Sequence, residues 1–216
     1  MIGVPAPKPL LRGWLHQGAV VLAVPAAIYL LAAAPPGAVR IGVAIYAVAL
    51  IGLFGTSAAY HRLRWSPRAL RIMRSLDHSM IFFLIAATHT AFAMMVLDGV
   101  WRWIVLSLVW AGTTLGIAFK LIRIDGFSRV GGTLYIALGW LGVATMPAAL
   151  REAGVWPLVL IAAGGLMYTA GALVLLRRRP DPNPRVFGYH EVWHALVVLA
   201  SACQYGAITL MLRADS

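Results

Sequence analysis

The sequence predicts an all-α fold: a polytopic bundle of seven transmembrane helices, with the N-terminus in the cytoplasm and the C-terminus outside. Three observations lead to this prediction. Of the 216 residues, 61% are hydrophobic and only 12% are charged, about half the charged share of a soluble domain. The apolar residues come in blocks of roughly 20, the length at which a helix spans a bilayer. Lys and Arg fall almost entirely between these blocks.

We expect one membrane domain over residues 1–216, because membrane helices pack into a single bundle. The breaks between the apolar blocks have physical causes. Pro35-Pro36-Gly37 cannot continue a helix, the basic stretch from Arg62 to Arg74 contains Pro67, and the run from Pro180 to Pro184 favours a rigid, extended loop. The expected spans are residues 17–34, 41–60, 77–97, 101–119, 130–150, 155–176 and 190–212.

The positions of Lys and Arg predict the orientation. Fourteen of the 18 lie at the N-terminus and in alternate loops, and the other four lie on the opposite side. Short cytoplasmic loops carry the excess of positive charge, so the N-terminus is expected inside. Lys8 and Arg12 before an apolar run ending at Ala34 also resemble a signal peptide. We expect this run to be an uncleaved first helix, because six further spans follow it.

Composition also excludes some classes of function. The net charge of +11 invites a nucleic-acid interpretation, but no basic face interleaved with aromatic side chains is present. We therefore expect no nucleic-acid partner and place the chain in a bacterial inner (plasma) membrane, with membrane lipids as partners. The single cysteine, Cys203, lies inside an apolar block and is expected to be a packing residue.

Ionisable residues at membrane depth are costly, which makes them candidates for function. Here they gather at the ends of three spans that the predicted orientation places on the cytoplasmic side. His190 and His194 are four residues apart, so one helix face carries both rings, within reach of a single metal ion. The stretches concerned are Ser57–His61 at the end of the second span, Leu76–His78 at the start of the third, and Tyr189–His194 at the start of the seventh.

These residues predict a metal centre, with zinc as the expected ion. His61, His190 and His194 would supply three imidazoles and leave a fourth tetrahedral position for water, as in catalytic zinc sites. Asp77 is expected to orient or deprotonate that water, and Ser57 to hydrogen-bond a substrate carbonyl or the water. Other divalent ions remain alternatives, because the general order of metal affinities favours copper over zinc. In the alternative without a metal site, the histidines anchor helix ends and Asp77 pairs with a nearby arginine.

A competing interpretation comes from His190-Glu191-x-x-His194, which matches the H-E-x-x-H signature of zinc proteases. A third ligand could then be Asp98 in Leu97-Asp98-Gly99. The predicted topology opposes that pairing, because it sets Asp98 and His190 at opposite ends of their helices, roughly 30 Å apart. Glu191 is instead expected to stabilise its helix N-terminus.

Two further histidines lie on the third span. His78 follows Asp77 directly and points about 100° away from it around a helix, so we expect a neighbour of the site. His89 lies about three turns deeper than Asp77. It is expected to be a neutral histidine that is hydrogen-bonded within the bundle.

The motifs Ser57-x-x-x-His61, Asp77-His78 and His190-x-x-x-His194, in this order and at one depth, resemble the haemolysin III family, relatives of the progestin and adiponectin receptors. The resemblance covers almost the whole chain. It implies a seven-helix fold, zinc held by His61, His190 and His194, and Asp77 and Ser57 near the zinc water. The wider superfamily, which includes alkaline ceramidases, implies hydrolysis of lipid amides.

The chain departs from this family in the third span, where Ala87-Thr88-His89-Thr90-Ala91 replaces the usual Gly-Thr-Tyr-Thr-Pro and removes an expected kink. We predict a zinc-dependent hydrolase of a lipid amide or ester. The first alternative is a zinc-stabilised membrane sensor without catalysis. The second is a pore-forming cytolysin, although these helices lack the polar rings that line pores.

Overall fold

The computed structural model describes residues 8–122 and 129–214. Within these ranges every regular element is a helix, apart from one isolated β-bridge between Asn183 and Phe187. Seven helical spans are long and apolar enough to cross a membrane, which confirms the predicted fold class. Arg123, one of the charges used to predict the orientation, lies outside the described residues, and the orientation itself stays a prediction.

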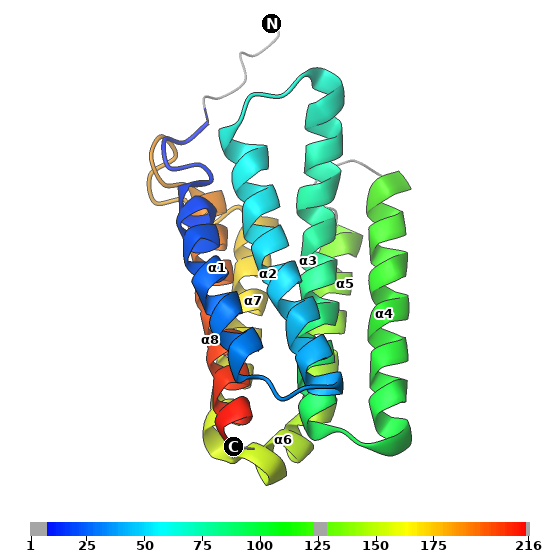
Figure 1. Ribbon diagram of the computed structural model, residues 1–216. Helices are drawn as coiled ribbons and strands as arrows, with labels where there is room; N and C mark the ends of the chain where they lie inside the picture. The colour runs from blue at the N-terminus through cyan, green and yellow to red at the C-terminus, as the bar shows by residue number, and fades with distance from the viewer. Residues whose placement is uncertain (1–7, 123–128, 215–216) are drawn as a thin grey trace, which may run out of the picture.

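Six of the spans form a closed ring, in which each helix contacts the next (Figure 1). The order around the ring is α1, α2, α3, α5, α7 and α8, and α8 returns to α1. Helix α4 packs outside the ring against α3 and α5. The helices are α1 (Trp14–Ala33), α2 (Ala38–Arg62), α3 (Pro67–Val96), α4 (Gly99–Ile122), α5 (Arg129–Trp140), η1 (Leu141–Thr145), α6 (Met146–Ala153), α7 (Val155–Arg177) and α8 (Tyr189–Ala214).

Helix α3 begins ten residues earlier than the sequence predicts, at Pro67 rather than at residue 77. Proline has no backbone N–H and a fixed φ, which suits the first turn of a helix, so Pro67 starts this helix instead of breaking it. Ser66 caps the end, because its Oγ accepts a hydrogen bond from the Ala69 backbone N–H at 3.3 Å. Asp77 and His78 therefore lie about three turns into α3. The sequence analysis had placed them at its start.

The fifth span is a broken helix. It runs as α5, continues as the 3₁₀ turn η1 and ends as α6, whereas the sequence predicts one helix over residues 130–150. Pro147 stands in the first turn of α6 and cannot donate the backbone hydrogen bond that would extend α5 through this point. The break turns the tighter η1 segment toward α3, where Gly142 faces the ring of His89.

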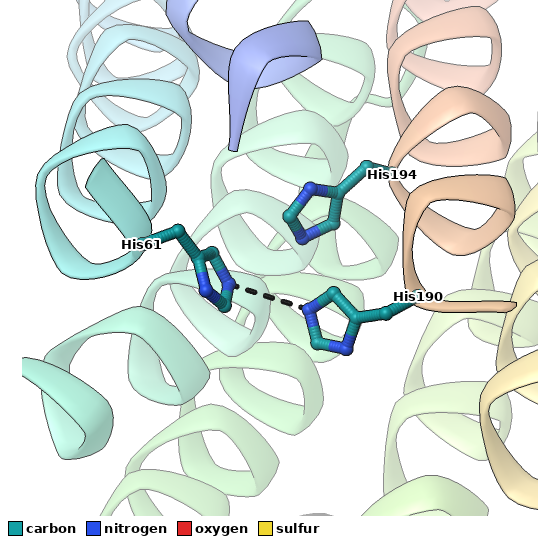
Figure 2. A group of neighbouring side chains, drawn as sticks. All are labelled: His61, His190 and His194. Atoms are coloured by element: carbon teal, nitrogen blue, oxygen red, sulfur yellow. Dashed lines mark hydrogen bonds between the residues drawn. The ribbon is translucent and has the colours of Figure 1, made fainter. Parts of the chain in front are cut away.

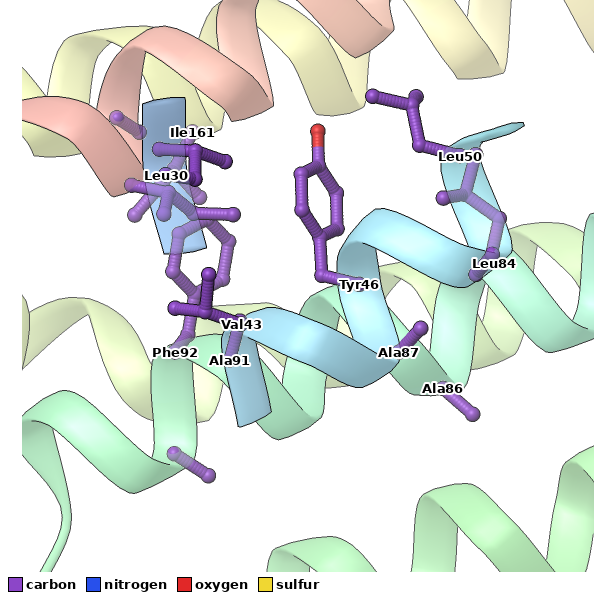
Figure 3. Close-up of a cluster of buried hydrophobic side chains, with 14 of the residues drawn as sticks. Leu30, Val43, Tyr46, Leu50, Leu84, Ala86, Ala87, Ala91, Phe92 and Ile161 are labelled. Atoms are coloured by element: carbon purple, nitrogen blue, oxygen red, sulfur yellow. The ribbon is translucent and has the colours of Figure 1, made fainter. Parts of the chain in front are cut away.

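The core lies where α2 and α3 meet α1, α7 and α8 (Figure 3). Small side chains on α3, among them Ala86, Ala87 and Ala91, are fully buried and let α2 approach closely. At Gly42 the backbones of the two helices come close: a Cβ there would lie 3.2 Å from the Thr90 carbonyl oxygen. In lipid, such close packing is a main source of helix association, because the bilayer is as apolar as the core.

Replacing Gly42 with Val tests this contact. We expect the variant to lose about 1–3 kcal/mol of stability, the usual cost of overpacking, seen as a lower unfolding temperature in mild detergent. Gly18→Val is the matched control, because a Cβ at Gly18 meets nothing within 4 Å. Equal losses in both variants would assign the effect to helix propensity and contradict the close approach.

Candidate metal centre

Three histidines from two helices meet at the end of the bundle where α1 begins (Figure 2). His61 lies in the last turn of α2, and His190 and His194 lie in the first two turns of α8. One ring nitrogen from each falls within 4.8 Å of the others. The predicted convergence of these residues, distant in sequence, is therefore present in the structure.

The distances suit a tetrahedral ion. The Nε2 atoms of His61 and His190 are 3.3 Å apart. Two nitrogens that each lie about 2.0–2.1 Å from one tetrahedral zinc ion are separated by roughly 3.3–3.4 Å. The ring of His194 lies 5.0 Å from that of His61 and 4.6 Å from that of His190, centroid to centroid. The group could thus hold one metal ion and leave one position open.

Glu191 fixes the start of α8 and is not a member of this group. Its carboxylate is fully buried, forms an ion pair with Arg12 and accepts a hydrogen bond from the Gly188 N–H at 2.8 Å. Asp98, the other residue of the protease interpretation, lies just beyond the far end of α3, where it pairs with Arg102 at 2.8 Å. Glu191 is therefore held in an ion pair rather than free to act as the base of a protease, and Asp98 is at the wrong end of the bundle to be its third ligand.

The segment before α1 covers the histidine group. Its backbone joins the loop before α8 through hydrogen bonds from Leu10 N to Arg185 O at 3.0 Å and from Leu11 N to Val186 O at 3.1 Å. Gly13 then turns the chain into α1 with φ of +80°. A Cβ at Gly13 would lie 2.8 Å from the Cβ of His61, so only glycine fits against this histidine.

Asp77 and Ser57 line the same cavity as His190 and His194. Ser57 is buried on α2, one turn deeper than His61, and interacts through a side-chain hydrogen bond with Asp77. Among the described residues Asp77 makes no ion pair, and nearby Arg74 donates instead to the Tyr60 hydroxyl at 3.2 Å. The carboxylate is therefore left to face the cavity beside the histidine group.

His16 is a residue of this site that the sequence analysis missed. It is buried in the first turn of α1, and its ring stacks on that of His194 with 3.9 Å between centroids and 18° between planes. Neither ring nitrogen has a hydrogen-bond partner among the described residues. The available signal was an ionisable side chain directly before the first predicted span, at the same end of the bundle as the other histidines.

The remaining histidines stay outside the group of three. His78 lines the cavity, and its backbone carbonyl accepts a hydrogen bond from the Tyr135 hydroxyl at 3.1 Å. His89 lies deeper, and its Nδ1 is 2.8 Å from the Ile85 carbonyl oxygen of the same helix, whereas the sequence analysis expected a hydrogen bond within the bundle without naming a partner. Cys203 is a free, half-buried thiol on α8, in keeping with a packing role.

Two members of the histidine group, His190 and His194, line a cavity of about 420 Å³ inside the helix ring. Its walls come from α1, α2, α3, α5, η1, α6, α7 and α8, and most of its lining side chains are apolar. The volume falls within the range of small-molecule sites, about 300–1,000 Å³. A ligand with a long apolar part would fit such walls and bring its polar end to the histidines.

Comparison with known proteins matches residues 5–205 to the family described as "Haemolysin-III related". The chain belongs to this family. It is 30% identical to Hemolysin-3 of Bacillus cereus over 88% of this chain and 85% of the relative. Identity to the Hemolysin-3 homolog of Bacillus subtilis (strain 168) is 29%, covering 88% and 87%.

A more distant similarity reaches into animals. The monocyte to macrophage differentiation factor of Homo sapiens is 24% identical over 76% of this chain and 67% of its own length. Together with the seven spans, the bacterial relatives identify this haemolysin III protein as an integral protein of the bacterial plasma membrane.

Metal analysis of the purified protein tests the histidine group. We expect about one ion per chain in protein prepared in mild detergent without chelators, and loss of that ion in His61→Ala and His190→Ala, since each removes one of three ligands. Elemental analysis measures the stoichiometry. The control is His78→Ala, which should keep its metal. Metal-free wild-type protein, or equal loss in the control, would contradict the site.

The fit at Gly13 gives a second test. Gly13→Ala and Gly37→Ala both force a side chain into positive φ, at +80° and +98°, and each should lose about 1–2 kcal/mol of stability. Only the Gly13 variant pushes a methyl group against His61, so it alone should weaken metal binding, by about tenfold or more. Metal titration against a competing chelator measures this difference. Equal metal affinities in the two variants would show that Gly13 does not position His61.

Proposed function

We propose that this protein is a zinc-dependent membrane hydrolase that cleaves an amide or ester bond of a lipid. The observation that carries the proposal is the position of the three histidines at the polar end of a large apolar cavity, with Asp77 and Ser57 beside them. Hydrolysis of a lipid needs these two features in contact: a polar reaction centre and an apolar space for the chain.

Each part of the site has a separate role in the proposed hydrolysis. When bound by three imidazoles, zinc would acidify a water molecule and polarise a carbonyl. Asp77 is the general base, because it is the acidic side chain among the cavity-lining residues. Ser57 donates its one hydrogen to Asp77 and so holds the ionised carboxylate in place. Once Asp77 has taken a proton from the water, the Ser57 hydroxyl is free to donate to the substrate carbonyl oxygen. The apolar walls bind the chain and limit the access of water.

Asp77→Asn separates catalysis from metal binding. The variant should keep its metal but lose activity about 10²–10⁴-fold, the usual contribution of a general base. Activity is measured as fatty acid released from N-acyl and ester lipids in vesicles, detected by mass spectrometry. Asp98→Asn, at the other end of the bundle, is the control and should keep full activity. Undiminished turnover in Asp77→Asn would remove Asp77 from this role.

One observation favours a second candidate, a membrane sensor in which zinc is structural. The group of three joins α2 to α8, two helices that pack chiefly on other neighbours, α2 on α1 and α3 and α8 on α7. A metal ion there would tie them together. In this case, removal of the metal lowers the unfolding temperature while no lipid is consumed in the same assay.

The Bacillus cereus relative carries the name hemolysin, which keeps a cytolytic activity as a third candidate for this chain. The cavity walls oppose it, since a conducting pore needs polar or charged rings along its length. Release of dye from vesicles at low protein-to-lipid ratio, unchanged in His61→Ala, would favour a pore over the hydrolase.

A further inference from the structure

The cavity has a second polar region, far from the three histidines. Its lining includes His89 on α3 and Gln204 on α8. Twelve residues separate Asp77 from His89, and ten separate His194 from Gln204. At a helix rise of about 1.5 Å per residue, both helices place this deep end about 15–18 Å from the metal-ligand end.

His89 presents a hydrogen-bond acceptor to the cavity. Its Nδ1 lies 2.8 Å from the Ile85 carbonyl oxygen, which can only accept, so Nδ1 carries the proton. A ring with both nitrogens protonated would place a charge at membrane depth, about 18 Å from the acidic residue of the cavity wall. The ring is therefore neutral, and Nε2 is a bare lone pair. It is buried and has no partner among the described residues.

Gln204 presents a second acceptor. Its Nε2 donates to the Ile161 carbonyl oxygen at 3.3 Å, which fixes the orientation of the amide. The Oε1 atom is then buried without a partner in the described part of the chain. Buried polar atoms are nearly always hydrogen-bonded, so two unpaired acceptors on one cavity wall require a molecule that brings donors to them.

Space has been left at this point for such a molecule. The residue of η1 that faces His89 is Gly142, and a Cβ there would lie 3.3 Å from Nε2. Any side chain would fill the position from which a donor could reach the lone pair. The break in the fifth span brings this glycine to the cavity wall.

We propose that the deep end of the cavity binds a hydroxyl group on the chain of a lipid, about 15–18 Å from the group held at the metal-ligand end. A hydroxyl has one hydrogen to donate, and its acceptor is the unpaired Nε2 of His89 beside Gly142. The apolar walls between the two ends take the chain. The inference rests on the proposed function for the position of the lipid's carbonyl end. Binding at the deep end is measured directly, without turnover.

The probes are hexadecanoic acid, 16-hydroxyhexadecanoic acid and its 16-methoxy analogue. They share a carboxylate for the metal-ligand end and a chain of suitable length, and they differ only in the terminal donor. Binding is measured by displacement of a fluorescent fatty acid from zinc-loaded protein in lipid nanodiscs. The wild type should bind the hydroxy acid about tenfold tighter than the other two, the effect of one buried hydrogen bond.

His89→Phe removes the acceptor while keeping apolar bulk. It should reduce the tenfold preference to about twofold or less and leave the affinity for hexadecanoic acid unchanged. Gly142→Ala keeps the acceptor and blocks the donor position, so it should do the same. Gln204→Leu removes the other unpaired acceptor of the deep end and should keep the preference. Thr114→Val, on the outer helix α4 and away from the cavity, is the control and should keep the preference.

The outcomes separate the two proposals. Equal affinity of the wild type for the three probes overturns the deep site and assigns its acceptors to water. A preference that survives in His89→Phe and Gly142→Ala, or that is lost in Gln204→Leu, overturns the assignment to His89. His61→Ala should weaken all three acids equally. If it weakens none while the hydroxyl preference remains, the metal-end function fails and the deep site stands.

Discussion

The buried carboxylate of Glu191 holds together the end of the bundle on which the candidate site depends. It accepts the Gly188 N–H at the start of α8 and pairs with Arg12 ahead of α1. A buried carboxylate that lost either partner would be costly, since its charge would be left uncompensated. This single residue therefore sets the register of α8 against the N-terminal segment. His190 and His194 flank it in sequence, and His16 follows Arg12 by one helical turn.

The seven spans could be predicted because span length and loop charge are local properties that a bilayer imposes on any sequence. The meeting of His61, His190 and His194 could be predicted for the same reason, since topology alone sets which helix ends share a depth. The start of α3 could not be predicted in this way, because a proline such as Pro67 breaks a helix in its interior but favours its first turn. Only the cap from Ser66 distinguishes the two.

Other features depend on contacts between distant segments. The stack of His16 on His194 requires α1 and α8 to be neighbours, and the order of helices around the ring is not written in any one of them. The same holds for the deep end of the cavity. His89 and Gln204 each look like an ordinary polar residue within a span, and their shared lack of a donor appears only when both line one cavity.

The two helices that supply the histidine group lie far apart in the chain, since His61 and His190 are 129 positions apart. During synthesis, α2 enters the membrane long before α8, the last of the described spans. Until α8 is in place, His61 is a lone imidazole without useful affinity for a metal ion. An ion held by this group would thus be acquired late in biogenesis, and bound metal in a preparation would report that the whole ring of helices has been inserted and closed.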